Sequence, residues 1–477
     1  MTGSVLVVTL LCWVTLLWAH LGGLGAGLWH DEIITVEQFV RGGPRAIFAG
    51  EYSLNNHMLF SLFGWFSTAL TGESEIIFRY WSVVPGLLAV ALGTWWASRS
   101  GSRAAGLTAL VLITSQAMHV AIVRQGRGYG LAALWVLLTL LAAWKALEPD
   151  APRRMLWLVG VPALLAIFTL PVTVLVLISL VPLLWMRDRA GSIRLTLVVG
   201  GVSLLWYARH LRGLVAGMGQ DFGEALPWHG PITGPLRYLL FPILRLAQPG
   251  YDDPIRHHPY PLSAWVVAWV IFGLLLVSLG IRFWNRRGST TQALVLVVPV
   301  FGSFLALTVS RSGLNERFVS YLVVPMLLLV AGGVAEGASI VSARLRSSRE
   351  LIWVAGTFCA VLLVGLVVPT YQRLVTTPIE AFKEVAEVIG DDTAPVLTNS
   401  LRPEGLHFYV GQVSILTNED LERAMCSSTE QPFYVIDHPY RQRRPLDTSC
   451  LSQAGVRPVV FEQLVRGDRI AVWHVEP

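Results

Sequence analysis

Long apolar runs recur along the whole of this 477-residue chain and constrain its fold more than any other feature. Hydrophobic residues make up 54% of the sequence, and charged residues make up only 14%. A soluble protein could not bury so many apolar helices on every side, whereas a lipid bilayer can cover them. The sequence therefore predicts an α-helical polytopic membrane protein.

Basic residues cluster in short loops between the apolar runs, as they do in loops that stay in the cytoplasm. The basic residues of these loops account for the net charge of +5, which therefore does not indicate a nucleic-acid partner. Placing all of them inside predicts about eleven transmembrane helices, a cytoplasmic N-terminus and an extracytoplasmic C-terminus, in a plasma membrane of bacterial type. The spans are expected near residues 4–20, 81–98, 104–122, 130–146, 155–170, 172–187, 194–210, 262–281, 292–309, 318–338 and 351–370.

Two apolar runs need a separate interpretation. Val5 to His20 lacks a basic segment before it, so we interpret it as an uncleaved first helix, with a cleaved signal peptide as the alternative. His57 to Leu70 is only about fourteen residues long, which is short for a span. We expect it to form an interfacial helix along the outer surface.

Three domains follow from this pattern. Residues 1–210 form a seven-span module with an outer loop over 21–80, and residues 211–370 form a further outer loop and four spans. Residues 371–477 are more polar and predict a small extracytoplasmic α/β domain, with a helix over 377–389 and strands over 394–398, 433–437, 456–461 and 469–474. Cys426 and Cys450 lie in this domain and could form a disulfide; two free thiols are the alternative.

The acidic pair Asp31–Glu32 follows the first apolar run and a glycine-rich hinge over 21–27. A carboxylate at the membrane surface is costly unless it faces water, a metal or a cation, so an acidic residue here suggests function. Asp31 and Glu32 fit a general base or a metal ligand. The alternative is that Asp31 caps a short interfacial helix.

Arginines on the predicted outer face could hold a phosphate, because a guanidinium group binds phosphate oxygens through two parallel donors. Arg124, Arg127 and Arg317 are the candidates, with Tyr129 beside Arg127. The alternative is that the arginines reach into the lipid headgroups. The sequence contains no zinc-finger spacing and no G-x-S-x-G motif. It also contains no P-loop, so a lipid-linked sugar donor is favoured over a nucleotide-activated one.

His30, Asn56 and His57 complete the set of polar candidates in the first outer loop. Imidazole and carboxamide groups can bind a sugar or a divalent metal ion. Asn56 and His57 also precede the predicted interfacial helix, so plain helix capping is an equal alternative for them.

The order of three segments resembles the integral-membrane glycosyltransferases with the C-type (GT-C) fold. Within that fold it is similar to glycosyltransferase family 39, the branch of protein O-mannosyltransferases and lipid A aminoarabinose transferases. The segments are Leu28-Trp29-His30-Asp31-Glu32, Asn55-Asn56-His57-Met58-Leu59 and Gly72 to Tyr80, followed by looser similarity at Arg124 to Tyr129 and at Asn315 to Phe318. The resemblance covers about residues 1–330, and it departs at Met58, where relatives often carry proline.

The resemblance implies an inverting transfer of a sugar from a polyprenyl-phosphate carrier to a hydroxyl group. Asp31 would deprotonate the acceptor, Glu32 would orient it or help to bind Mg²⁺ or Mn²⁺, and the arginines would hold the leaving phosphate. The acceptor is expected to be a protein, a lipid or a glycan. A transporter or flippase of a lipid-linked saccharide is the alternative, although no convincing two-fold repeat supports it.

Overall fold

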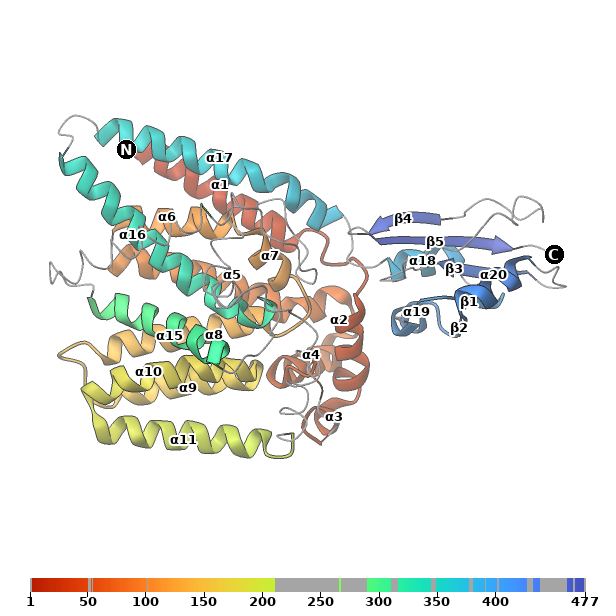
Figure 1. Ribbon diagram of the computed structural model, residues 1–477, viewed down its shortest axis with the longest axis horizontal. Coiled ribbons are helices and arrows are strands. Elements are labelled where there is room, and N and C mark those ends of the chain that lie inside the picture. The colour runs from red at the N-terminus through yellow and green to blue at the C-terminus, as the bar shows by residue number, and fades with distance from the viewer. Residues whose placement is uncertain are drawn as a thin grey trace.

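The computed structural model shows a bundle of helices with a small sheet at one end (Figure 1). It describes residues 2–49, 53, 55–100, 102–210, 266, 290–309, 316–344, 349–376, 381–390, 392–400, 403–426, 432–437, 461–465 and 468–475. The outer loop expected over 211–260 and the span expected over 262–281 therefore lie outside the described residues, apart from Val266.

The N-terminal half of the bundle holds the outer loop and the helices around it. In chain order its elements are α1 (Thr2–Leu21), α2 (His30–Thr35), the π-helix η1 (Val36–Val40), α3 (Gly43–Ala49), α4 (Met58–Thr71), α5 (Glu75–Ser100), α6 (Arg103–Thr114), α7 (Ala117–Val123) and α8 (Tyr129–Ala146). The bundle continues with α9 (Met155–Thr169), the 3-10 helix η2 (Pro171–Thr173), α10 (Val174–Arg187), α11 (Arg189–Tyr207), α15 (Thr290–Val309), the 3-10 helix η3 (Glu316–Leu322), α16 (Val323–Arg344) and α17 (Arg349–Thr376).

Within the described residues, six helices are long and apolar enough to cross a membrane. They correspond to the spans expected near 4–20, 81–98, 130–146, 194–210, 318–338 and 351–370. The span expected over 104–122 is instead broken into α6 and α7, which meet at an angle of 68° and raise the number to seven if they count as one span. At the break, Thr114 and Ser115 bond through their hydroxyl groups to carbonyls four residues back. Such bonds often bend helices.

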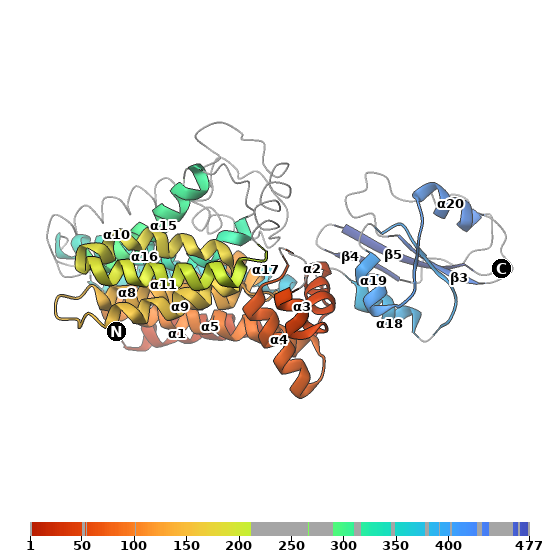
Figure 2. The same cartoon turned by 90° about the horizontal axis from the view of Figure 1, so that it is seen from below.

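Shorter apolar helices account for other expected spans. Met155–Thr169, Pro171–Arg187 and Ala293–Ser303 fall in the ranges that the sequence marked as spans, and the last of them is part of the 20-residue helix α15. The number eleven thus stays a prediction. Met58–Thr71 is also short, as expected for the interfacial helix, and α2, α3 and α4 gather at the end of the bundle nearest to the sheet (Figure 2).

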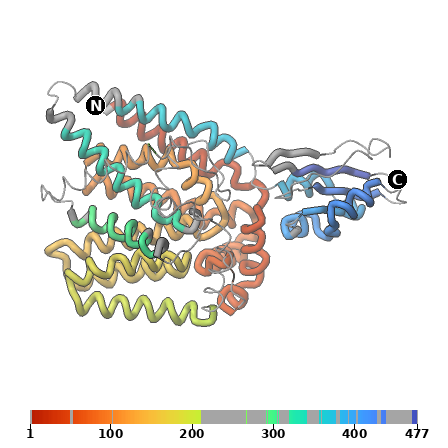
Figure 3. The backbone as a smooth tube through the Cα atoms, in the orientation of Figure 1, coloured from red at the N-terminus to blue at the C-terminus, as the bar shows by residue number. Residues whose placement is uncertain are grey.

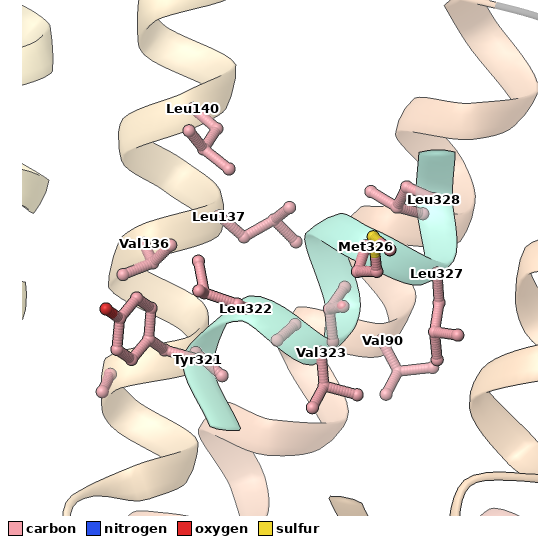
Figure 4. Packing of buried hydrophobic residues seen from close by; sticks show 14 of the residues in the cluster. Val90, Val136, Leu137, Leu140, Tyr321, Leu322, Val323, Met326, Leu327 and Leu328 are labelled. Atoms are coloured by element: carbon pink, nitrogen blue, oxygen red, sulfur yellow. The ribbon is translucent and has the colours of Figure 1, made fainter. Parts of the chain in front are cut away.

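The core of the bundle forms where α8 packs against α5 and against the segment around the junction of η3 and α16. Figure 4 shows Val136, Leu137 and Leu140 of α8 facing Tyr321 and Leu322, with Val90 of α5 on the other side of that segment. A Cβ atom added at Gly130 of α8 would lie 1.9 Å from the backbone oxygen of Ser82 in α5. The two helices thus approach at backbone level, a packing that small residues allow in membranes.

The sheet contains five strands in the order β2-β1-β3-β5-β4. They are β1 (Val396–Thr398), β2 (Ser414–Ile415), β3 (Phe433–Asp437), β4 (Phe461–Val465) and β5 (Asp468–Val475), and the helices α18 (Phe382–Ile389), α19 (Pro403–Tyr409) and α20 (Asn418–Cys426) pack beside them. β1 is parallel to β2 and β3, whereas β5 is antiparallel to β3 and β4. Sequence reasoning did not predict β2, and of the strand expected over 456–461 the structure describes only its last residue, where β4 begins.

The two ends of the chain enter the fold in different places. α1 lies beside α17 along one edge of the bundle, whereas β5 ends the chain at the far side of the sheet (Figure 3). Between them, one buried apolar cluster joins the first outer loop to the sheet domain. It includes Leu28, Ile33 and Phe60 from the loop together with Phe382 and Leu406 from the domain.

Candidate active site at the start of helix α2

Arg79, on the first turns of α5, organises the irregular hinge that leads into α2. Its guanidinium group donates hydrogen bonds to the backbone oxygens of Leu24, Ala26 and Gly27, at 2.7, 2.7 and 2.9 Å. Buried carbonyls outside regular structure need such partners, because a lost hydrogen bond in a dry environment is costly. Arg79 therefore fixes the path of the chain just before the acidic pair.

Glu32 is fully buried and forms the other half of this arrangement. Its two carboxylate oxygens accept from Arg79 at 2.9 and 2.7 Å. One of them also accepts from the backbone nitrogen of Trp29 at 3.0 Å, and the other accepts from that of Gly126. Because Trp29 is the N-cap of α2, this carboxylate completes one side of a capping interaction. Glu32 thereby joins the hinge, α2, α5 and the loop before α8.

Asp31, the next residue back, points away from Glu32 and toward Arg127. The Asp31 Oδ2 atom lies 2.7 Å from Arg127 Nη1, and Arg127 Nη2 donates to Asn55 Oδ1 at 2.8 Å. The Arg127 side chain is completely buried, whereas the Asp31 side chain is 13% exposed. Asp31 is thus the member of the pair that meets solvent. It lies in the first turn of α2, and the N-cap is Trp29, so Asp31 does not cap this helix.

The glycines around Arg127 explain how this arginine reaches Asp31. A Cβ atom at Gly126 would lie 2.5 Å from the Phe78 ring, and one at Gly128 would lie 2.7 Å from Thr169 Cγ2 and 3.1 Å from the His57 ring. Neither position has room for a side chain. The glycine-rich segment therefore serves close packing.

Tyr129 and His57 lie beside the same pair, whereas the Asn56 side chain is engaged elsewhere. Tyr129 lies under Arg127, whose guanidinium carbon is 5.3 Å from the ring centroid, and the His57 ring meets Tyr129 edge to face at 5.2 Å. His57 takes the N-cap position of α4, but its side chain makes no capping bond. Asn56 instead donates to the backbone oxygen of Ile47 and accepts from Ser61, so its side chain holds α3 against α4.

Three predicted residues lie apart from this group or beyond description. Arg124 donates to the backbone oxygen of Gly22 at the end of α1. His30 Nδ1 lies 3.6 Å from Glu404 Oε2 in α19, across the boundary between the loop and the sheet domain. The backbone of Arg317 falls in η3, but its side chain lies outside what the structure describes.

The acidic pair does not fit the expected divalent cation. Both oxygens of Glu32 are already engaged by a guanidinium group and two backbone amides. Across the described part of the chain, no group of three or more His, Cys, Asp or Glu side chains could hold a metal ion. We therefore derive no step through a metal.

Sequence reasoning missed two members of the site, Arg79 and Asn55. Both lie within segments that carried the resemblance. Arg79 is a charged residue at the start of an apolar run, and such a cation needs an acidic partner, which here is Glu32. Cys426 of the sheet domain is disulfide-bonded, whereas Cys12 in α1 and Cys359 in α17 are free. Cys450 lies outside the described residues, so the Cys426–Cys450 pairing stays a prediction.

Comparison with known proteins places this geometry in a recognised fold. No family model matches the chain, and no curated protein matches it in sequence. Among solved structures, it is similar to ArnT from Cupriavidus metallidurans in the apo state, with 16% identity, a TM-score of 0.54 and coverage of 99% of this chain and 98% of that one. The same protein bound to undecaprenyl phosphate gives a TM-score of 0.57 at 14% identity, with the same coverage of both chains.

A second neighbour is the archaeal oligosaccharyltransferase AglB from Archaeoglobus fulgidus, in complex with an inhibitory peptide and a dolichol-phosphate. It is 12% identical, with a TM-score of 0.52, over 91% of this chain and 69% of that one. These neighbours share the GT-C fold of membrane glycosyltransferases. At such low identity the similarity establishes the fold, and the predicted GT-C fold is confirmed.

Proposed function

We propose that this protein is a membrane glycosyltransferase that moves a sugar from a polyprenyl-phosphate carrier to a hydroxyl acceptor at the extracytoplasmic face. The observation that carries the proposal is the pairing of a partly exposed Asp31 with a fully buried Arg127. The GT-C fold supports it, as do neighbours solved with undecaprenyl phosphate and with a dolichol-phosphate.

Asp31 is the general base in this proposal. The acceptor oxygen attacks the anomeric carbon of the donor while the Asp31 carboxylate takes the hydroxyl proton. The bond between that carbon and the phosphate oxygen breaks, and the polyprenyl phosphate leaves with the electron pair. A single displacement of this kind inverts the configuration of the sugar, and a positioned base speeds such a step by about 10²–10⁴-fold.

Arg127 has a positioning role here in place of the phosphate contact that the sequence suggested. Its side chain has no exposure, and both of its terminal nitrogens are engaged by Asp31 and Asn55. It stabilises the negative charge of Asp31 and aims one carboxylate oxygen. In this proposal another cation on the outer face contacts the donor phosphate. Arg317 is the candidate from the sequence.

Glu32 is a positioning residue in the same proposal. Its four hydrogen bonds fix the first turn of α2, on which Asp31 lies. A reacting group held to within a fraction of an ångström gains rate from orientation alone. Neither Glu32 oxygen needs to touch substrate for this effect.

The test is a transfer assay with the purified protein in proteoliposomes. A panel of polyprenyl-phosphate sugars, hexosyl and pentosyl, is supplied with protein, lipid or glycan acceptors. We expect one donor and acceptor pair to give a product of inverted configuration. Movement of the donor across the bilayer in the absence of any acceptor, with no product in its presence, would instead identify a flippase.

A further inference from the structure

The helix α19 of the sheet domain reaches over the start of α2. Leu28, three residues before Asp31, donates from its backbone nitrogen to the hydroxyl of Tyr409 at 2.7 Å. Glu404, at the other end of the same helix, lies 3.6 Å from the ring nitrogen of His30, the residue next to Asp31. Two side chains of one short helix thus meet the chain on either side of Trp29.

The same boundary holds a second set of contacts from α18. Lys383 pairs with Glu75 at 3.0 Å and donates to the backbone oxygen of Gly25 at 3.2 Å. Tyr409 also reaches Glu75, at 3.4 Å. Burial raises the pKa of Tyr409, so its hydroxyl keeps its proton and can donate to Glu75 while it accepts from Leu28.

The apolar cluster beneath these polar contacts makes the arrangement rigid. Phe382 and Leu406 of the domain are completely buried in the same cluster as Leu28 and Ile33 of the loop. The loop also passes close to α18, since a Cβ atom at Gly27 would lie 2.9 Å from Lys383 Cβ. A loop packed so closely cannot shift unless the domain shifts with it.

We propose that α19 is a positioning element of the active site: Tyr409 holds Leu28 through a hydrogen bond, Glu404 lies against His30, and together they set where Asp31 lies. The proposal rests on the proposed function for its consequence in catalysis, and it gives the sheet domain a direct part in the reaction. Tyr409 and Glu404 are positioning residues and do not contact the reacting atoms.

The contact itself is tested without any substrate. In the full-length protein in nanodiscs, we expect Tyr409→Phe to raise amide hydrogen exchange across 28–35 by about tenfold, because the Leu28 nitrogen loses its acceptor. The strands 396–398 and 433–437 should keep their protection. The matched control is Tyr434→Phe, which removes a tyrosine–carboxylate bond to Asp392 in the same domain and should leave 28–35 unchanged.

The catalytic consequence is tested by kinetics on the same preparations. Tyr409→Phe and Glu404→Gln should each lower kcat by about tenfold with little change in the KM of the lipid-linked donor, since a displaced base slows the chemical step. Glu419→Gln, an exposed position on α20, is the matched control for the loss of a carboxylate.

Each outcome has a distinct meaning. Unchanged exchange over 28–35 in both α19 variants would overturn the proposal, as would higher exchange that includes the strands, because the domain itself would then have loosened. If exchange rises as expected but the wild-type protein transfers no sugar, the proposed function fails while the structural coupling stands. If kcat is unchanged although exchange rises, α19 does not position Asp31.

Discussion

Asp31 and Arg127 are 96 positions apart in the chain, yet the Asp31 Oδ2 atom lies 2.7 Å from Arg127 Nη1. Buried cations are rarely left without a partner, and this one is completely inaccessible. Its partner is the carboxylate that meets solvent. The pair therefore has a fully buried member, Arg127, and a partly exposed member, Asp31.

Replacing Asp31 with asparagine should remove the base and keep the shape. We expect the rate of sugar transfer to fall by about 10²–10⁴-fold, since the amide cannot accept the acceptor proton. The measurement is initial transfer rate in proteoliposomes, with the apparent Tm as a check that the variant folds. An undiminished rate would defeat the assignment of Asp31.

Replacing Arg127 with lysine keeps the charge but loses the fork that bridges Asp31 and Asn55. We expect kcat to fall by about tenfold or more, with the KM of the donor little changed, because orientation of the base is lost. Arg187→Lys, at an exposed arginine that contacts only backbone oxygens in the described region, is the control. A raised donor KM at constant kcat would instead show that Arg127 binds the donor.

Two Arg–Glu pairs of this protein differ mainly in burial and offer a matched comparison. Arg79–Glu32 is buried, whereas Arg41–Glu73 is exposed. In each pair the guanidinium group donates at least two hydrogen bonds to the carboxylate. Glu32→Gln should destabilise the protein by about 3–5 kcal/mol, because it leaves a buried guanidinium without its charge partner. Glu73→Gln should cost about 0–1 kcal/mol.

The comparison is made by thermal unfolding in detergent, with both variants measured at the same detergent concentration. Equal shifts in apparent Tm for the two variants would contradict the structural role assigned to Glu32.

Gly130 and Gly201 allow a similar comparison for helix packing. Adding a methyl group at Gly130 places it 1.9 Å from a backbone oxygen of α5, so Gly130→Ala should cost about 1–3 kcal/mol or more. Nothing lies within 4 Å of a methyl group at Gly201 in α11, so Gly201→Ala should be neutral or stabilising by up to about 1 kcal/mol. The apparent Tm of each variant decides the matter, and a loss at Gly201 equal to that at Gly130 would refute the packing argument.

Glu384 gives a prediction about pH. Burial raises its pKa above the usual range, and Glu387 adds to the effect while Lys383 and Arg79 oppose it. A raised pKa in the folded state means that ionisation disfavours folding as pH rises above the unfolded value. Glu384→Gln should therefore be more stable than the wild type at pH 7, by no more than about 1 kcal/mol for this half-exposed group.

That difference should vanish as pH falls below about 4.3, the pKa of an unperturbed glutamate. Apparent Tm measured from pH 4 to pH 8 tests it, with Glu419→Gln as the control. A gain that is the same at every pH would mean that ionisation of Glu384 is not its source.

The positions of many helices in the bundle could be predicted, because a long apolar run indicates a helix that lipid covers. The helices α1, α8 and α17 begin and end within a few residues of the expected spans, apart from the extra turn at the end of α17. The break between α6 and α7 was not predictable from hydropathy, since Thr114, Ser115 and Gln116 interrupt the run without adding charge. At the break, Thr114 and Ser115 bond backward along the helix through their hydroxyl groups.

The structure brings several of the candidate residues together, but their pairing could not be predicted from the sequence. The sequence singled out Asp31, Glu32 and Arg127 as candidates. It could not show that the two neighbouring carboxylates point to different arginines. Successive residues of a helix face different directions, so Asp31 faces Arg127 and Glu32 faces Arg79. Only the positions of α5 and of the loop before α8 decide which cation each one meets.

Arg79 has one further consequence, which concerns how this protein can change over evolutionary time. Since a single side chain satisfies three carbonyls of the segment 24–27, these hydrogen bonds place no demand on the side chains there, and only the buried Leu24 and the crowded Gly27 are constrained by packing. Loss of Arg79, in contrast, would release the hinge and Glu32 together. In related chains we expect variable residues at positions 25 and 26 beside an arginine that does not vary.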